Sequence, residues 1–249
     1  MTTDSSNIKP MTHGTTNGIT NGGTNGHLKE YLVKRSDLHD RMTKDSSGKS
    51  VIEWYDGEAT LYDDQFEHAN FIYHKDTAQA LADYVKDRGA KVLDLAAGSG
   101  KIGLLLKGHG FCNMDALDGS SGMLKLAKEK GIYQKYFHCM VDSKKIPEVD
   151  DASYDAVSCG GSVAKGHLSY DTIQTMLRAV KPGGYLIFSC AGWNFQFEEF
   201  SRTKLDDCFS ELKKRGLCAT VEERPSFHIG EEPGFIFILR RGDGVLNGH

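Results

Sequence analysis

A chain of 249 residues with 39% hydrophobic residues is long enough for one globular domain of about 200 residues and a tail. Its net charge of −4 and pI near 6.2, without a basic stripe, argue against nucleic acid as a routine partner. No run of about 18 apolar residues could span a membrane, and the N-terminus lacks the apolar segment of a signal peptide. We therefore expect a cytoplasmic protein with no membrane partner.

Cysteine usage agrees with that location. The six cysteines are scattered and form no Cys-x-x-Cys pair, which predicts reduced and mostly buried thiols. Because a zinc site needs clustered ligands, we expect no metal.

The first 50 residues are expected to form a low-complexity tail. Thr-Asn-Gly recurs at 16–18, 20–22 and 24–26, in a segment too polar to bury a core, and a short charged helix could lie within 28–45. The folded domain is expected over 51–241, with lid helices in 51–89, a sheet core in 90–241 and a flexible tail in 242–249.

An amphipathic helix is predicted over 77–86, with Asp76 as its N-cap and Gly89 at its end. Strands and helices then alternate along the chain. The predicted strands are 91–95, 113–117, 136–141, 154–158, 184–190, 217–223 and 234–240, and the predicted helices are 101–107, 121–130, 170–180 and 199–215.

This alternation predicts an α/β fold with a doubly wound, mostly parallel seven-stranded sheet of the Rossmann-like kind. The acid- and proline-rich loop 222–233 leaves no room for a helix between the last two strands. The C-terminal strands should therefore form an antiparallel hairpin.

A glycine-rich turn follows the apolar strand that begins near Val92. Gly98 and Gly100 permit the positive φ angles and close approach that a ligand-binding loop needs. Asp118 comes about 20 residues after Gly98, at the end of the next apolar stretch. A carboxylate at this spacing is typical of a nucleoside site, where it accepts hydrogen bonds from ribose hydroxyls.

Two other nucleotide-binding motifs share features with this turn. Residues 98–103 match the Gly-x-Gly-x-x-Gly dinucleotide pattern, which leaves an NAD(P)-dependent reductase as an alternative. Against it stand Asp94 inside the strand end, the terminal hairpin and the lack of a Tyr-x-x-x-Lys pair. A phosphate-binding P-loop fails because Ile102 follows Gly-Lys and Leu95 replaces its first glycine.

The ordered motifs resemble those of the class I, seven-stranded S-adenosylmethionine-dependent methyltransferases. The similar segments are Asp94-x-Ala-x-Gly-Ser-Gly, residues 116–124, Asp142, residues 153–157 and Lys-Pro-Gly-Gly at 181–184. Trp-Tyr-Asp at 54–56, Leu-Tyr-Asp at 61–63 and residues 131–134 further resemble the methyltransferase-like protein 27 group.

The resemblance implies S-adenosylmethionine as cofactor and assigns a role to each motif residue. Asp94 orients the glycine turn or binds the cofactor's amino group through water, Asp118 binds the ribose, and Tyr62 lies on the lid beside Tyr55 and Tyr73. The other implied cofactor-binding residues are Gly98, Ser99 and Gly100 along the methionine and ribose, Gly119, Ser120 and Met123 beside the adenine, Asp142 and Ser143 at its edge, and Cys159, with Gly160 and Gly161, at the methionine end.

No catalytic residue is assigned from the sequence. The candidates for a general base are His74, His138, His167 and His228, with His167 preferred because it follows the 159–161 loop. Asp56 and Asp63 are expected to be helix caps or surface acids.

The acceptor is expected to be a small molecule. Ser-Cys-Gly-Gly-Ser at 158–162 replaces the Asn-Pro-Pro-Tyr signature of amino-purine and glutamine-amide methylation. A protein that binds S-adenosylmethionine without catalysis remains a second alternative, because fold and site are separate claims. The sequence does not predict the oligomeric state.

Overall fold

The structure is a computed structural model that describes residues 44, 48–68, 71–141, 143–228 and 230–244. Seven strands form one sheet in the order β3-β2-β1-β4-β5-β7-β6. β7 runs antiparallel to both β5 and β6, and the other neighbouring strands are parallel. The strands are β1 (Val92–Leu95), β2 (Met114–Asp118), β3 (Tyr136–His138), β4 (Tyr154–Cys159), β5 (Val180–Ala191), β6 (Cys218–Phe227) and β7 (Pro233–Arg241).

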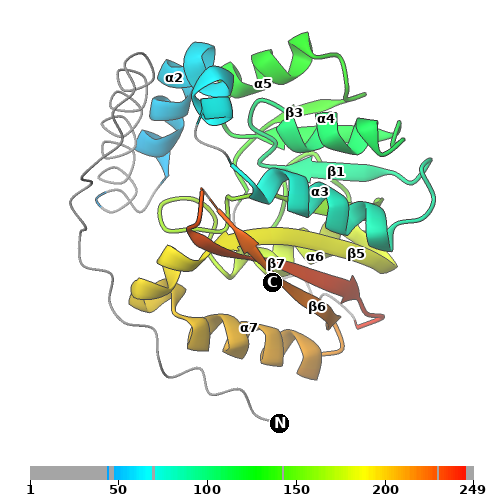
Figure 1. Cartoon of the computed structure of the whole chain (residues 1–249). Helices are drawn as coiled ribbons and strands as arrows, with labels where there is room; N and C mark the ends of the chain where they lie inside the picture. Colours follow the sequence, from blue (N-terminus) through cyan, green and yellow to red (C-terminus); the bar gives the residue numbers. More distant parts are fainter. Residues whose placement is uncertain (1–43, 45–47, 69–70, 142, 229, 245–249) are drawn as a thin grey trace.

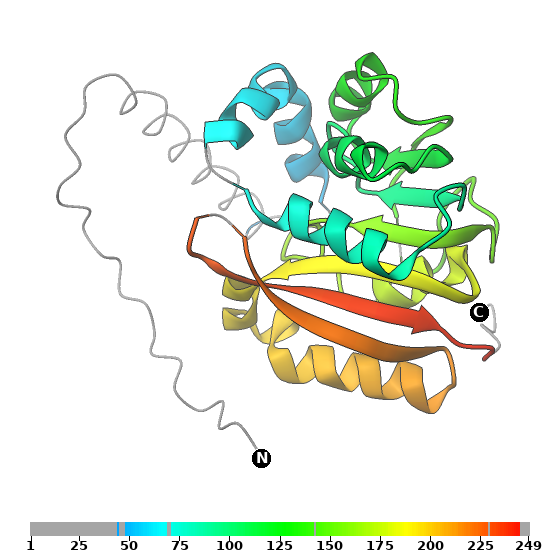
Figure 2. The same cartoon turned by 45° about the vertical axis from the view of Figure 1, so that its right-hand side comes forward.

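This topology confirms the predicted doubly wound sheet and its C-terminal hairpin. Helices cover both faces: α3 and α4 lie on one face, and α6 and α7 on the other (Figure 1). Figure 2 shows the sheet of β5, β7 and β6 between α3 and α7. The helices are α2 (Lys49–His68), α3 (Tyr73–Tyr84), α4 (Lys101–Gly108), α5 (Ser121–Glu129), α6 (Thr172–Ala179) and α7 (Arg202–Lys214), and two 3-10 turns, η1 (Gly192–Gln196) and η2 (Glu198–Phe200), precede α7.

Alternating side chains divide the core into two layers. In β1, Leu93 and Leu95 pack with α6 and α7, whereas Val92 packs with α3, α4 and α5. In β7, Phe237 belongs to the first layer and Ile236 to the second. This two-residue period is the expected pattern for strands buried on both faces, and it leaves the strand ends available for a site.

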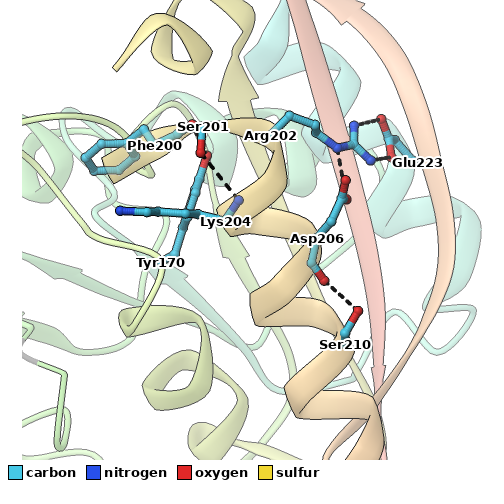
Figure 3. Close-up of polar contacts among 8 residues, drawn as sticks. All are labelled: Tyr170, Phe200, Ser201, Arg202, Lys204, Asp206, Ser210 and Glu223. Carbon is cyan, nitrogen blue, oxygen red and sulfur yellow. Dashed lines mark hydrogen bonds and ion pairs between the residues drawn. The ribbon is translucent and has the colours of Figure 1, made fainter. Parts of the chain in front are cut away.

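Helix α7 is fixed to the far edge of the sheet by polar contacts. Ser201 caps the helix, because its hydroxyl accepts a hydrogen bond from the Lys204 amide. Arg202 pairs through two nitrogens with Glu223 of β6, at 2.6 and 2.8 Å, and through Nε with Asp206 (Figure 3). This two-point contact orients α7 against β6.

Several predicted boundaries are wrong. The helix predicted from residue 77 begins at Tyr73 and ends at Tyr84, so Asp76 lies in its first turn and is not the N-cap. Asp76 instead accepts a hydrogen bond from Ser226 at 2.6 Å, which joins α3 to β6. The predicted turn at 181–184 lies within β5, at a register shift opposite Tyr154 and Ala156.

The predicted tail and its charged helix lie almost wholly outside the described residues. In the described part, no helix is long and apolar enough to cross a membrane. Within that same part, no three histidine, cysteine or acidic side chains are grouped so that they could hold a metal ion. The six cysteines are free thiols.

Candidate functional site

A cavity of about 370 Å³ lies at the carboxyl ends of β1, β2 and β4, with α2 along one side. This is where ligands bind in doubly wound sheets, and the volume falls within the range of roughly 300–1,000 Å³ for small-molecule sites. Its glycine-loop end is formed by residues 95–99 and 117–119. Its histidine end contains Tyr55, Tyr62, Tyr73, His74 and His167.

Asp118 joins two loops at the glycine-loop end. Its carboxylate accepts hydrogen bonds from the Gly98 amide at 2.7 Å and the Ser120 amide at 2.8 Å. Burial raises the pKa of Asp118, although both amides favour the charged form. The spacing that predicted a nucleoside site thus corresponds to a direct contact between the two motifs.

The two glycines of the turn have different surroundings. Both have positive φ angles, 54° at Gly98 and 85° at Gly100. A Cβ on Gly98 would meet no described atom within 4 Å, and Gly98 lines the cavity. A Cβ on Gly100 would lie 3.1 Å from the Tyr133 ring and 3.3 Å from Ile132. Gly98 therefore leaves room for a ligand, whereas Gly100 allows the turn to pack on the core.

Asp94 lies beneath the turn and is 1% exposed. Its carboxylate accepts hydrogen bonds from the Tyr133 hydroxyl at 2.5 Å and the Ser158 hydroxyl at 2.8 Å. Burial raises its pKa to about 6, against the opposing effect of these hydrogen bonds. Asp94 thus links β1 to β4 and to the segment after α5, in a position suited to orienting the turn.

The loop after β2 forms a narrow apolar wall. A Cβ on Gly119 would lie 2.7 Å from both the Ile52 and the Met140 side chains, so this position accepts no larger residue without movement. Met123 lines the cavity and is buried. Ser120 caps α5 by accepting a hydrogen bond from the Met123 amide at 3.1 Å. Sequence reasoning missed Ile52 and Met140, which lie outside the motifs.

Of the remaining predicted site residues, some line the cavity and others do not. Ser99 and Ser143 line the cavity, whereas Asp142 lies outside the described residues. Cys159 is fully buried, and burial raises the pKa of its thiol. The described residues that line the cavity include Gly160 and Gly161, but not Asp94, Gly100, Ser120 or Cys159.

Two acids fix α2 over the glycine-loop end. Asp56 accepts hydrogen bonds from the Ser120 hydroxyl at 2.6 Å and the Gly122 amide at 2.8 Å, which places it at the start of α5. The expectation that it serves as a cap therefore agrees with these contacts, although the helix it contacts is α5 and not its own. The bond from Ser120 joins α2 to the loop that follows β2, and the bond from Gly122 joins it to the first turn of α5.

Asp63 is neither a cap nor an isolated surface acid. It accepts a hydrogen bond from the Ser99 hydroxyl at 2.5 Å, pairs with Lys130 at 2.6 Å and lies 3.5 Å from the Lys101 ammonium. Burial acts to raise its pKa, but the hydrogen bonds from Lys130 and Ser99 outweigh it and lower the pKa. This cluster joins α2 to the glycine turn, and the sequence spacing gave no indication of it.

The histidine end is aromatic and largely uncharged. Burial lowers the pKa of His74 to about 3, and burial also lowers the pKa of His167. Burial raises the pKa of Tyr62. The Tyr55 hydroxyl lies 3.0 Å from His167 Nε2. The cavity therefore holds two imidazoles that are neutral at pH 7.

The other two candidate histidines lie outside the cavity lining as described. His138 is exposed, and its Nε2 lies 3.0 Å from the Gly119 carbonyl oxygen. His228 stacks on the Tyr73 ring at a centroid distance of 4.7 Å and an angle of 10°. Tyr73 in turn lies 4.1 Å from the His74 ring. The His167 ring contacts a second cavity side chain, that of Tyr55, through a hydrogen bond.

Comparison with known proteins agrees with this geometry. Residues 93–188 match the family described as "Methyltransferase domain". Methyltransferase-like protein 27 of Homo sapiens is 31% identical over 137 residues, which cover 54% of this chain and 55% of that protein. The chain thus spans about half the length of the curated relatives it matches.

Solved structures share the fold at lower identity. A SAM-dependent methyltransferase from Aquifex aeolicus has a TM-score of 0.54 at 19% identity, over 75% of this chain and 98% of its own. Magnesium protoporphyrin IX methyltransferase from Synechocystis, solved with bound SAH, has a TM-score of 0.52 at 15% identity, over 68% and 83% of the two chains.

Residues 93–188 match a methyltransferase domain, as the resemblance of the motifs implied. The sheet order, the antiparallel β7 and the glycine turn at the end of β1 agree with this similarity to the class I S-adenosylmethionine-dependent methyltransferases.

Proposed function

We propose that this chain binds S-adenosylmethionine in the described cavity and transfers its methyl group to a small-molecule acceptor. The observation that carries the proposal is the contact between Asp118 and Gly98 within that cavity. It brings a buried carboxylate, suited to ribose hydroxyls, beside an open glycine turn, suited to close backbone approach. The family match over residues 93–188 supports the same cofactor.

The residues present fit this cofactor. Asp118 would accept the ribose hydroxyls, and Gly98 and Ser99 would lie along the ribose and methionine. Ile52, Met123 and Met140 supply an apolar wall of the kind that an adenine ring needs. Gly119 keeps that wall open, because any side chain there would meet Ile52 and Met140. Ser143, and Asp142 beside it, remain proposed for the adenine edge.

The neutral histidine end supports a small acceptor. At this end the described lining comes from α2, α3 and the segment 160–172, which supports a second binding region next to the proposed methionine end. In methyl transfer the protein mainly aligns the nucleophile with the methyl group and excludes water. Helix α2, held down by Asp56 and Asp63, would provide that exclusion.

The test is isothermal titration calorimetry of the full chain with S-adenosylmethionine, S-adenosylhomocysteine and NADH. We expect micromolar binding of the first two and no binding of NADH. Binding of NADH alone would overturn the proposal in favour of a reductase. Consumption of S-adenosylmethionine in the presence of a small-molecule extract, compared with heat-treated protein, then separates an enzyme from a protein that only binds the cofactor.

A further inference from the structure

The hydrogen bond between Tyr55 and His167 joins two segments that the sequence separates widely. Tyr55 lies on α2, and His167 lies on the loop between β4 and α6. The Tyr55 hydroxyl is 3.0 Å from His167 Nε2, and the two rings meet edge to face at 5.7 Å. Both side chains line the cavity. A polar pair inside the site is therefore assembled only when α2 is docked.

The other ring nitrogen of His167 fixes the direction of this hydrogen bond. Nδ1 lies 3.3 Å from the Lys165 carbonyl oxygen, which can only accept. Nδ1 must then carry the proton in the neutral ring, which leaves a lone pair on Nε2. The Tyr55 hydroxyl consequently donates to Nε2, and its own oxygen can accept a further hydrogen bond.

We infer that Tyr55 and His167 form the proton-accepting pair of this enzyme, and that its acceptor is a hydroxyl or amine that loses a proton when it is methylated. The inference rests on the proposed function and adds an acceptor class and a base to it. The arrangement is that of a general base that acts through a bridging hydroxyl.

The proposed step requires only the sulfonium donor, the acceptor, Tyr55 and His167. The acceptor's lone pair forms the new bond to the methyl carbon as the carbon–sulfur bond breaks with its electron pair left on sulfur. The acceptor's proton moves to the Tyr55 oxygen, and the Tyr55 proton moves to His167 Nε2. The Lys165 carbonyl holds the opposite side of the resulting imidazolium.

Charge is conserved in the cavity during this step. A sulfonium is positive before the transfer, and the imidazolium is positive after it. Burial disfavours the charged form of His167, and a second nearby cation would disfavour it further. His167 is therefore kept in its base form while the sulfonium is present, and it accepts a proton more readily once that charge is lost.

Other titratable groups around the cavity could also exchange protons when a ligand binds, and their contribution must be distinguished from that of His167. The titratable side chains that share the described lining are Tyr62 on α2, Tyr73 and His74 on α3, Lys101 on α4, Asp118 on β2, Cys139 after β3, and Asp171 beside α6. Asp94 lies beneath the turn with a raised pKa, and the Lys165 ammonium pairs with Glu199. A measurement of proton exchange must therefore be compared with a variant that lacks only the His167 imidazole.

The experiment measures the protons released when S-adenosylmethionine and S-adenosylhomocysteine bind, by calorimetry in buffers of different ionisation enthalpy at a series of pH values below the ordinary histidine pKa of about 6.5. The two ligands share the ribose and adenine and differ by the methyl group and its charge. We expect S-adenosylmethionine to release more protons than S-adenosylhomocysteine in the wild type. This difference should fall in His167→Asn and His167→Gln, and persist in the control His109→Asn at the far end of α4.

Ring ¹⁵N shifts of His167 give a second readout that does not depend on turnover. We expect the neutral Nδ1–H form in the wild type and a changed Nε2 shift in Tyr55→Phe. An equal proton release for both ligands, an unchanged difference in both His167 variants, or a ring protonated on Nε2 would overturn the inference. If neither ligand binds, both the proposed function and this inference fail. If both ligands bind with equal proton release, only the proton-accepting pair is refuted.

Discussion

The two ends of the cavity are built in different ways. The glycine-loop end uses backbone amides and one carboxylate at the ends of adjacent parallel strands, joined by the bonds from Gly98 and Ser120 to Asp118. The histidine end uses side chains from helices and a long loop, joined by the bond between Tyr55 and His167. The first end depends on the sheet, and the second depends on the docking of α2.

This difference suggests that the glycine-loop end binds the cofactor and the histidine end binds the acceptor. Under the proposed function, a cofactor common to a large family would be bound by backbone geometry that many sequences can supply. An acceptor particular to one protein would be bound by side chains on elements that are free to vary. Changes at the two ends should therefore have separable effects on binding.

The largest effect is expected from Asp118→Ala. The substitution removes the acceptor of two backbone amides and the proposed partner of the ribose, and hydrogen bonds to charged groups contribute roughly 1.5–3 kcal/mol each. We expect binding of S-adenosylhomocysteine to weaken by about 100-fold, or ~3 kcal/mol. Calorimetry beside the exposed control Asp207→Ala checks this, and unchanged affinity would refute the assignment of Asp118.

The sequence predicts an end of the cavity well when its contacts join residues that are close in the chain, and poorly when they join distant elements. The strands, the glycine turn and the spacing from Gly98 to Asp118 depend on local turn chemistry and on alternation, which a single chain displays directly. The structure confirmed the sheet and its terminal hairpin on this basis. Local signals failed for Asp76, because its carboxylate bonds to Ser226 of β6 and the helix begins earlier.

Long-range side-chain pairs were not predictable in the same way. Asp63 and Ser99, and likewise Tyr55 and His167, come from elements whose relative placement depends on the whole packing. No spacing rule connects such positions, and an acid on an amphipathic helix is usually solvated. The sequence therefore predicts a cap or a surface acid at Asp63, whereas the structure shows contacts with both Ser99 and Lys130.

A second prediction concerns the pH dependence of the glycine-loop end. Burial raises the Asp94 pKa to about 6 in the folded protein, above its ordinary value of about 3.9. A carboxyl with a raised pKa binds its proton more tightly when folded, so this contribution to stability is present at low pH and is lost as the pH rises through 4 to about 6. The loss should be on the order of 3 kcal/mol or less.

Urea unfolding at several pH values measures this loss. In Asp94→Asn the free energy of unfolding should fall less steeply over that range, while the slope in the control Asp207→Asn should match the wild type. Asp118, whose pKa is also raised, would supply the slope that remains in Asp94→Asn. Equal slopes in wild type and Asp94→Asn would show that Asp94 does not titrate in this range.

A third prediction tests whether α2 couples the two ends. Asp63→Ala removes the partner of Ser99, Lys130 and Lys101, and should weaken binding of S-adenosylhomocysteine by about 10-fold, or ~1.4 kcal/mol. Hydrogen exchange should increase along α2, which also carries Tyr55. The exposed α2 residue Glu53 offers a matched control as Glu53→Ala.

The same contact has a definite pH dependence. The pKa of Asp63 is lowered in the folded protein, so its contribution is present above the ordinary value near 4 and is lost as the pH falls through the folded value. Protection of the α2 amides, corrected for the intrinsic exchange rate at each pH, should therefore fall in acid in the wild type and change little with acid in Asp63→Ala. Identical exchange in the two proteins at neutral pH would show that the docking of α2 does not depend on Asp63.

The smallest effect is expected at a site remote from both ends. Arg202 makes its two-point contact with Glu223 where α7 meets β6, and both side chains are partly exposed, at 41% and 31%. Exposed pairs contribute roughly 0–1 kcal/mol, and a planar guanidinium contributes more at such a site than an ammonium does. A double-mutant cycle of Arg202→Ala and Glu223→Ala should therefore give a coupling energy of about 0.5–1 kcal/mol.

Neither variant should change the affinity for S-adenosylhomocysteine or the proton release on binding, because the contact lies outside the cavity lining. A loss of affinity in Arg202→Ala would mean that the position of α7 is transmitted to the histidine end. The structure contains a contact that could transmit such an effect: Tyr170 of the loop before α6 donates to the carbonyl of Phe200, at the end of η2 and just before α7, at 2.8 Å. Unchanged affinity would mean that ligand binding at the histidine end depends on the docking of α2 and not on the position of α7.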